Sequence, residues 1–242
     1  MLEMREALKR KQVIGIVGGM GSYATLNFFS RLLAYFPAER EWDRPRIIID
    51  NYCTMPSRVR AIIYKEKYKE VYMALANSIK LLIDGGATDI VLVCNTAHCF
   101  LKDIFKLYPE YKNYVIDIIA LCARELNRGG WKEIYLIATE GTVQTNIYTE
   151  ALQRYGIQAI LPSKKEQAEI RKYIEAVKQN KITQEIKMDF AQFIYEIECK
   201  QILLGCTEIP VLCQSMDKII NKTIIDPLEY VCKELKIRGK RY

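Results

Sequence analysis

Two short apolar segments of this chain lead into cysteines at corresponding places in two halves that repeat one pattern. The first segment, 90–93, is followed by Cys94, and the second, 201–204, is followed by a glycine and then Cys206. Before and between them, short strand-like segments alternate with longer amphipathic helical segments. Such alternation predicts parallel sheets flanked by helices. We therefore expect an α/β fold of two similar lobes, related by a pseudo-two-fold axis, with a site between them.

The first half predicts three strands and two main helices. Strands are expected at 13–17, 46–50 and 90–93, and a long helix is expected over 64–84, ended by Gly85-Gly86. The helix after the first strand is expected to bury one apolar face, which carries Leu26, Phe29, Leu32 and Leu33.

The second half repeats this plan. A strand is expected at 133–138, in addition to the one at 201–204, and a long helix is expected over 183–198 with Thr183 as its N-cap. The crossover between the halves lies near 117–128, and the last helix is expected to return to the first half.

The two halves define two lobes. The first is expected to comprise 1–117 plus 226–242 and to carry Cys94, and the second is expected to comprise 118–225 and to carry Cys206. Ligands of parallel α/β sheets bind beyond the carboxyl ends of the strands. Each lobe therefore places one cysteine where chemistry is expected.

The composition limits the class of protein. A chain of 242 residues fits one large domain or two compact ones. The net charge of +7 is spread over predicted helix surfaces without interleaved aromatic residues, which argues against a nucleic-acid partner. No apolar run is long enough to cross a membrane, and the charged segment 1–12 lacks the apolar centre of an export signal. We therefore expect a cytoplasmic protein, without a membrane partner, that acts on a small molecule.

Eight cysteines accompany a single histidine, His98. Without an export signal, the cysteines are expected to be mostly reduced, and most of them to be small core residues. No pair has the spacing of a structural zinc site, so no metal is expected. Cys94 and Cys206 stand apart because each follows a strand and precedes polar residues.

Two thiols on opposite sides of a small molecule can act as a paired acid and base. One thiolate removes the alpha proton of an amino acid from one face, and a thiol returns a proton to the other face, which inverts the configuration. This chemistry needs no pyridoxal phosphate and no other cofactor. Both cysteines are expected at strand-to-helix turns, where backbone N–H groups and the helix dipole favour a thiolate.

Motifs along nearly the whole chain, from residue 13 to about 232, fit one family. In order they are Ile14-Gly15-Ile16-Val17-Gly18-Gly19-Met20-Gly21 with Ala24-Thr25, Met55-Pro56-Ser57-Arg58, Cys94-Asn95-Thr96-Ala97-His98, Ala138-Thr139-Glu140-Gly141-Thr142, Gly205-Cys206-Thr207-Glu208 and Asp226-Pro227. They resemble the aspartate/glutamate racemase family, most of all its aspartate racemase branch. The resemblance implies a cofactor-independent isomerase that interconverts L- and D-aspartate or glutamate, and relatives typically form homodimers.

The resemblance also implies roles for individual residues. Cys94 and Cys206 would be the catalytic thiols, with Cys206 serving the L-enantiomer and Cys94 the D-enantiomer. Arg58 would bind a substrate carboxylate with its planar fork, and Lys178, which aligns only with a one-residue gap, would be a second substrate-binding cation. The other substrate-binding candidates are Met20, Gly21, Asn95, Thr96, Ala97, Thr139 and Thr207, and the supporting candidates are His98 and Glu208.

Several residues keep a second interpretation. Arg58 also fits an ordinary surface arginine, and Lys178 an ordinary lysine on a helix face. His98 either holds the turn after the first cysteine or tunes its thiol. The family pattern is broken at Ser22, Tyr52 and Cys53, and the last two are expected close to the substrate.

Other functions also fit part of the chain. The loop Gly19–Ala24 matches the G-x-G-x-x-G/A template of dinucleotide-binding domains, although Asp50 lies further along the chain than the roughly 20 residues usual for that motif. A non-catalytic amino-acid-binding protein is a second alternative. Related carbanion chemistry, such as maleate isomerisation, arylmalonate decarboxylation or hydantoin racemisation, is a third. A serine hydrolase is disfavoured, because the chain has no G-x-S-x-G motif.

Overall fold

The first half of the chain forms a three-stranded parallel sheet in the computed structural model, which describes residues 11–213 and 222–241. β1 (Val13–Gly18) lies in the middle, between β2 (Arg46–Asn51) and β3 (Asp89–Leu92). All three predicted strands are confirmed to within one residue at each end. The charged opening segment, apart from its last two residues, lies outside the described residues.

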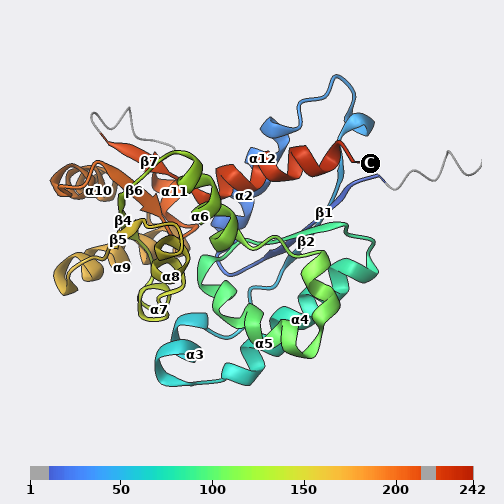
Figure 1. Ribbon diagram of the computed structural model, residues 1–242, viewed down its shortest axis with the longest axis horizontal. Helices are drawn as coiled ribbons and strands as arrows, with labels where there is room; N and C mark the ends of the chain where they lie inside the picture. The colour runs from blue at the N-terminus through green and yellow to red at the C-terminus, as the bar shows by residue number, and fades with distance from the viewer. Residues whose placement is uncertain (1–10, 214–221, 242) are drawn as a thin grey trace, which may run out of the picture.

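Helices cover both faces of this sheet (Figure 1). α4 (Tyr68–Asp84) and α5 (Leu101–Leu107) enclose one core with the sheet, and α2 (Ser22–Tyr35) and α12 (Pro227–Gly239) enclose another on the opposite face. The shorter helices of this half are η1 (Glu41–Asp43), α3 (Arg58–Tyr64), η2 (Asn95–Phe100) and η3 (Pro109–Asn113).

The single helix expected over 64–84 is in fact two helices. α3 and α4 are separated by residues 65–67, where Lys65 and Lys67 adopt left-handed φ angles of 60° and 52°. These angles interrupt the helical backbone, and side-chain periodicity does not reveal them. Gly86, with a φ of 91°, follows the end of α4 as predicted.

The apolar face expected on α2 is partly wrong. Leu26 is 62% exposed and Leu33 is 36% exposed, whereas Phe28 is fully buried against the sheet. The rotation of the helix is set at its first turn, where the Thr25 hydroxyl accepts a hydrogen bond from the backbone N–H of Gly19 (3.1 Å). α2 has more apolar residues than one face can hold, so this contact selects the buried ones.

The second half forms a four-stranded parallel sheet in the order β5-β4-β6-β7. The predicted central strands are confirmed as β4 (Glu133–Ile137) and β6 (Gln201–Leu204). The edge strands β5 (Gln158–Ile160) and β7 (Thr223–Ile225) were not predicted, because three residues are too few to show a period.

Helices flank the second sheet as they flank the first. α6 (Ile118–Arg128) and α8 (Ile147–Gln153) cover one face, and α9 (Lys164–Lys178) and α10 (Gln184–Glu196) cover the other. Two short helices, α7 (Glu140–Gln144) and α11 (Ile209–Cys213), follow the ends of β4 and β6. The Thr183 hydroxyl accepts from the N–H of Ile186 (3.2 Å), as expected of the N-cap of α10. The expected α/β class, with two parallel sheets flanked by helices, is confirmed.

The last helix returns to the first half, as expected. Asp226 follows β7 and caps α12, where it accepts from the N–H of Leu228 (2.9 Å). The same carboxylate forms an ion pair with Arg31 of α2, and α12 packs along α2 and α6 (Figure 1).

None of the helices in the described ranges has the length and apolar character needed to cross a membrane.

Candidate active site

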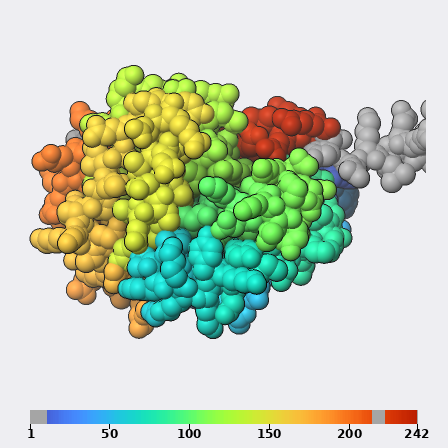
Figure 2. All heavy atoms as spheres, turned by 60° about the horizontal axis from the view of Figure 1, so that its bottom comes forward, coloured from blue at the N-terminus to red at the C-terminus, as the bar shows by residue number. Residues whose placement is uncertain are grey.

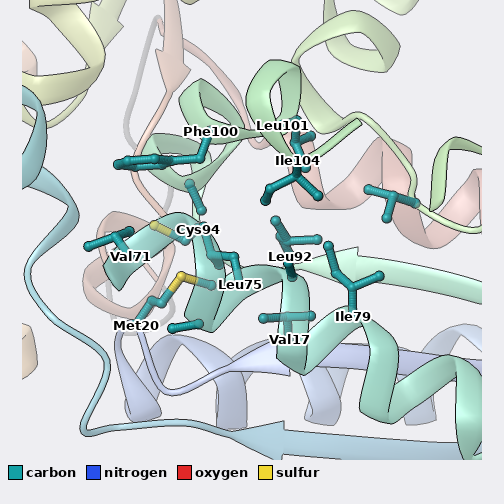
Figure 3. Packing of buried hydrophobic residues seen from close by; sticks show 14 of the residues in the cluster. Val17, Met20, Val71, Leu75, Ile79, Leu92, Cys94, Phe100, Leu101 and Ile104 are labelled. Atoms are coloured by element: carbon teal, nitrogen blue, oxygen red, sulfur yellow. The ribbon is translucent and has the colours of Figure 1, made fainter. Parts of the chain in front are cut away.

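Cys94 lies at the carboxyl end of β3, where the chain turns into η2. β3 is buried along its whole length, and Cys94 belongs to the same core cluster, with 9% of its surface exposed. Figure 3 shows Cys94 and Met20 at one end of this cluster, beside Val71 and Leu75 of α4. The thiol is thus at the boundary between the first core and the space beyond the strand ends.

The turn after Cys94 is held by His98. The imidazole Nε2 accepts a hydrogen bond from the N–H of Ile118 (3.2 Å), so Nδ1 carries the proton and donates it to the carbonyl of Cys94 (3.0 Å). The ring links the cysteine turn to the start of α6, the crossover helix. Both ring nitrogens contact backbone atoms, which supports the holding role over direct contact with the thiol.

Cys206 occupies the matching place in the second half. It follows β6 and Gly205, precedes α11, and is 4% exposed. Glycine is needed before it, because a Cβ at position 205 would lie 2.7 Å from Cδ1 of Leu136. The Cys206 thiol donates a hydrogen bond to Oε2 of Glu208 (3.0 Å).

Both cysteines line one cavity between the lobes. Its lining residues are Met20, Ser57, Arg58, Val59, Cys94, Asn95, Thr96, Thr139, Lys178, Cys206, Thr207 and Glu208. The two sulfur-bearing turns therefore share one space, as the pairing of the two motifs predicted. Ser57 and Val59 were missed, although the motif around Arg58 marked their segment of the chain.

Three predicted site residues do not line this cavity. Ala97 is fully buried in the first core, and its N–H donates to the carbonyl of Cys94 (3.2 Å). His98 lies behind the turn, and Gly21 packs against Glu208 across the lobe boundary. Each of these residues supports the cavity wall from outside.

The cavity is small, about 30 Å³, which leaves room for roughly two water molecules. An amino acid does not fit this space, so its entry requires the walls to move apart. Figure 2 shows the cyan segment around α3 in contact with the yellow segment around α7, and these two helices come from different lobes. A larger cavity, about 1010 Å³, lies elsewhere, beside the exposed Trp42, and neither Cys94 nor Cys206 lines it.

Three threonine hydroxyls join the lobes at one wall of the cavity. Thr96, two residues after Cys94, shares hydrogen bonds with Thr139 (2.8 Å) and Thr142 (2.9 Å) of the second half. Thr139 and Thr142 also contact each other (3.1 Å). Thr142 had not been assigned a role from the sequence, although it closes the motif that contains Thr139.

Asn95 and Thr207 also reach across the lobe boundary. The buried hydroxyl of Tyr148 on α8 donates to Oδ1 of Asn95 (2.8 Å), and the hydroxyl of Thr207 donates to the carbonyl of Val93 (3.4 Å). The polar residue after each cysteine thus contacts the opposite half. Tyr148 is a further residue that sequence reasoning missed, because nothing in its local pattern marks it.

Arg58 lies between the turn after β1 and the start of α3. Its guanidinium donates to the carbonyls of Met20 (2.8 Å), Pro56 (3.0 Å) and Met55 (3.4 Å), while its buried Nε contacts no acceptor among the described residues. Arg58 is therefore not an ordinary surface arginine. It braces the loop that carries it and presents a positive charge to the cavity.

Lys178 reaches the cavity from the last turn of α9. Its ammonium contacts Glu175 (3.4 Å) on the same helix. Burial works to lower the pKa of Lys178, but the charges of Glu208, Cys206, Glu175 and Cys94 outweigh it and raise that pKa. Lys178 is thus an exposed residue of α9 that also lines the cavity containing both thiols.

The surroundings of Cys206 act against the thiolate that was expected there. Burial raises the pKa of the Cys206 thiol well above its ordinary value, the Glu208 carboxylate raises it further, and Lys178 opposes them only in part. The helix that follows, α11, has five residues, too short for a strong dipole. These surroundings therefore favour the thiol form of Cys206 over the thiolate that the turn position suggested.

The glycine-rich loop is arranged unlike a dinucleotide site. A Cβ at Gly21 would lie 2.4 Å from Oε1 of Glu208, so an acidic side chain occupies the place where a pyrophosphate would approach. Asp50 accepts a hydrogen bond from Ser78 (2.6 Å) instead of facing that loop. The described residues also contain no group of three or more His, Cys, Asp or Glu side chains placed to hold a metal ion.

The residues that depart from the family pattern lie outside the cavity wall. The backbone of Tyr52 and Cys53 packs against Gly19, whose φ of 75° and lack of a side chain allow the close approach. The exposed Cys53 sulfur contacts the Ser22 hydroxyl (3.2 Å). Neither Tyr52 nor Cys53 lines the cavity, so they are further from the substrate space than expected.

Comparison with known proteins gives concordant results. The family model described as Asp/Glu/Hydantoin racemase matches residues 17–235. The chain is 31% identical to the Picrophilus torridus aspartate racemase, with a TM-score of 0.80 over 95% of this chain and 94% of that one. It is 27% identical over 205 residues to the broad specificity amino-acid racemase RacX of Bacillus subtilis, across 81% of this chain and 86% of the relative. It is also 24% identical to a glutamate racemase of Carboxydothermus hydrogenoformans, over 71% of this chain and 64% of that protein. As its two cysteine motifs predicted, the chain belongs to the Asp/Glu/hydantoin racemase family.

Proposed function

We propose that this protein racemises aspartate by a two-base mechanism in which Cys94 and Cys206 act on opposite faces of the alpha carbon. As a member of a racemase family, the chain is an isomerase that acts on amino acids without a cofactor. The observation that carries the residue assignment is that both thiols line one small cavity, from equivalent places in two α/β units.

The mechanism requires one thiolate and one thiol. The thiolate takes the alpha proton from one face of the substrate, and the thiol donates its own proton to the other face. The product has the opposite configuration, and the two cysteines have exchanged protonation states. No electrons are transferred, and the number of protons on the enzyme is unchanged.

Two cations favour a dicarboxylic substrate. Arg58 comes from the first half and Lys178 from the second, and both line the cavity. A carboxylate between them would gain charge-assisted hydrogen bonds. Asn95, Thr96, Thr139 and Thr207 supply neutral polar groups for the second carboxylate.

Aspartate fits these features better than glutamate. The cavity is small, about 30 Å³, so the shorter side chain requires less opening. The likeness to the Picrophilus torridus aspartate racemase supports the same choice. Broad specificity, as in the name of the RacX relative, is the second candidate, because Tyr52 and Cys53 depart from the family pattern beside the loop that carries Arg58.

A panel of L- and D-amino acids, followed by chiral chromatography, tests this proposal. We expect racemisation to be fastest with aspartate, slower with glutamate and absent with uncharged amino acids. Deuterium incorporation at the alpha carbon in heavy water is the matched readout. Absence of exchange with every amino acid would favour a non-catalytic binding protein, and turnover of maleate or a hydantoin would point to the related carbanion chemistries.

Three further parts of the proposal concern the whole molecule. The lobes comprise 1–117 plus 226–242 and 118–225, and the protein acts in the cytoplasm as a homodimer. The return of α12 to α2 supports the discontinuous first lobe. Light scattering of the purified protein tests the dimer, and cell fractionation tests the location.

A further inference from the structure

Glu208 is a buried carboxylate in direct contact with one of the two thiols. It is 4% exposed, and its Oε2 accepts from the thiol of Cys206 (3.0 Å) and from the hydroxyl of Thr207 (3.3 Å). Its other oxygen packs against Gly21 of the opposite lobe, where a Cβ would lie at 2.4 Å. The carboxylate is therefore held in place from both sides of the lobe boundary.

Titratable groups reach Cys206 from several elements. Lys178 approaches from α9, Tyr148 from α8, Cys94 from the turn after β3, and Glu208 from the same turn as Cys206. Lys178 is the one cation among these four, and its ammonium also contacts Glu175 (3.4 Å). Arg58 is a second cation that lines the same cavity, from the start of α3. The negative charge of Glu208 is closest to the thiol, so burial and Glu208 together raise the pKa of Cys206.

Cys94 has different surroundings. The residue two positions after it is Thr96, a neutral side chain whose hydroxyl bonds to Thr139 and Thr142. Its own turn is held by a histidine that contacts backbone atoms on both ring nitrogens. The two thiols are equivalent in position along the fold but differ in the charge beside them.

We propose that Glu208 is a positioning residue that keeps a proton on Cys206 in the substrate-free enzyme, so that Cys206 starts as the acid and Cys94 as the base. This inference rests on the proposed two-thiol racemase. In the forward step, the Cys94 thiolate takes the alpha proton and Cys206 gives its proton to the opposite face. The enzyme is left with a Cys94 thiol and a Cys206 thiolate, and a proton then passes from Cys94 to Cys206 to restore the resting form.

The proposal predicts a particular kinetic asymmetry. Two enantiomers have equal free energy in water, so kcat/KM must be the same in both directions. The bias therefore appears as a parallel difference in KM and kcat. The enantiomer whose alpha hydrogen faces Cys94 binds the abundant form of the enzyme and has the lower KM, while its mirror image binds the scarce form and has the higher KM.

Glu208→Gln tests the proposal by removing the charge while keeping the size and a hydrogen-bond acceptor. We expect the KM values of the two enantiomers to converge. We also expect the alkaline limb of kcat/KM to move to lower pH by on the order of 1 unit, because the Cys206 thiol now ionises sooner, while the acidic limb stays in place. Glu175→Gln is the matched control: it removes the same charge beside Lys178 without touching Cys206, and should leave the KM difference unchanged.

A second measurement needs neither turnover nor a variant. The pH midpoints of alkylation by iodoacetamide are read separately for Cys94 and Cys206 by peptide mass spectrometry. We expect the Cys206 midpoint to lie at higher pH. Equal midpoints, or KM values that converge as much in Glu175→Gln as in Glu208→Gln, would overturn the proposal. If the protein racemises no amino acid, the proposed function fails. The alkylation midpoints still test, without turnover, whether Cys206 beside Glu208 holds its proton to higher pH.

Discussion

The turns that carry Cys94 and Cys206 occupy the same place in two α/β units, but their surroundings differ. The Cys94 turn is held by His98, and a threonine lies two positions after the cysteine, whereas Cys206 follows a glycine, and a buried carboxylate lies two positions after it. A repeated fold thus supplies two thiols that line one cavity. The side chains beside them differ, with a carboxylate on Cys206 and threonine hydroxyls near Cys94, and a two-base reaction needs one acid and one base at any moment.

Replacing either cysteine gives the largest expected effect. We expect Cys94→Ser and Cys206→Ser each to lower racemisation by about 10²- to 10⁴-fold, because a hydroxyl is a far weaker base than a thiolate. Each variant should retain weak alpha-deuterium exchange with one enantiomer, and the two variants should retain opposite ones. Chiral chromatography and mass spectrometry in heavy water give both readouts. The exposed thiol of Cys53 provides the control, and full racemisation by either active-site variant would contradict the two-base mechanism.

Replacing Arg58 and Lys178, one from each lobe, compares how much each lobe contributes to substrate binding. We expect Arg58→Ala to lower kcat/KM for aspartate by about 10- to 100-fold, because a charge-assisted hydrogen bond is lost. Lys178→Ala is expected to cost about 10-fold, since an ammonium lacks the planar fork of a guanidinium. Arg60→Ala is the control, because this exposed arginine pairs with Glu66 away from the cavity. An equal loss in the control would show that only folding was affected.

The turn at Cys206 differs from the turn at Cys94 because a tightly packed glycine, Gly205, precedes its cysteine. Gly205→Ala places a Cβ 2.7 Å from Leu136 and 3.2 Å from Ala138, and we expect a loss of about 1–3 kcal/mol in the free energy of unfolding. Denaturant titration measures it. Gly141→Ala, whose Cβ would meet its nearest neighbour at 3.3 Å, should cost less, and the reverse order would refute this account of the turn.

The threonine contact between the lobes gives the smallest expected effect. Thr142→Val removes one hydroxyl from the three that meet there, and we expect a loss of about 1 kcal/mol in stability with a modest rise in KM. Thr142→Ser keeps the hydroxyl and should retain most of the stability and most of the substrate affinity. Thermal unfolding and steady-state kinetics measure the pair, and similar losses in both variants would mean that the methyl group matters more than the hydrogen bonds.

Local sequence was sufficient for much of the fold and for the site. Strands β1 to β4 and β6, the cap at Thr183 and the meeting of both cysteines in one cavity were all predicted. The break between α3 and α4 was not, because it depends on two lysines with left-handed backbone angles that no side-chain pattern marks. The buried face of α2 was misjudged because a hydrogen bond to the glycine-rich turn sets its rotation.

The chemistry of each turn comes from residues that are adjacent in the sequence. A strand that ends in a cysteine followed by polar side chains can therefore be recognised from a short stretch of sequence. For that reason the sequence was enough to predict two thiols, their pairing and the racemase family. The direction in which the pKa of Cys206 is shifted could not be predicted from the sequence. It depends on burial, on a carboxylate packed against Gly21 and on a lysine from another helix. Electrostatic energies depend on distances in space and on the exclusion of water, and both exist only once the two lobes have closed on each other.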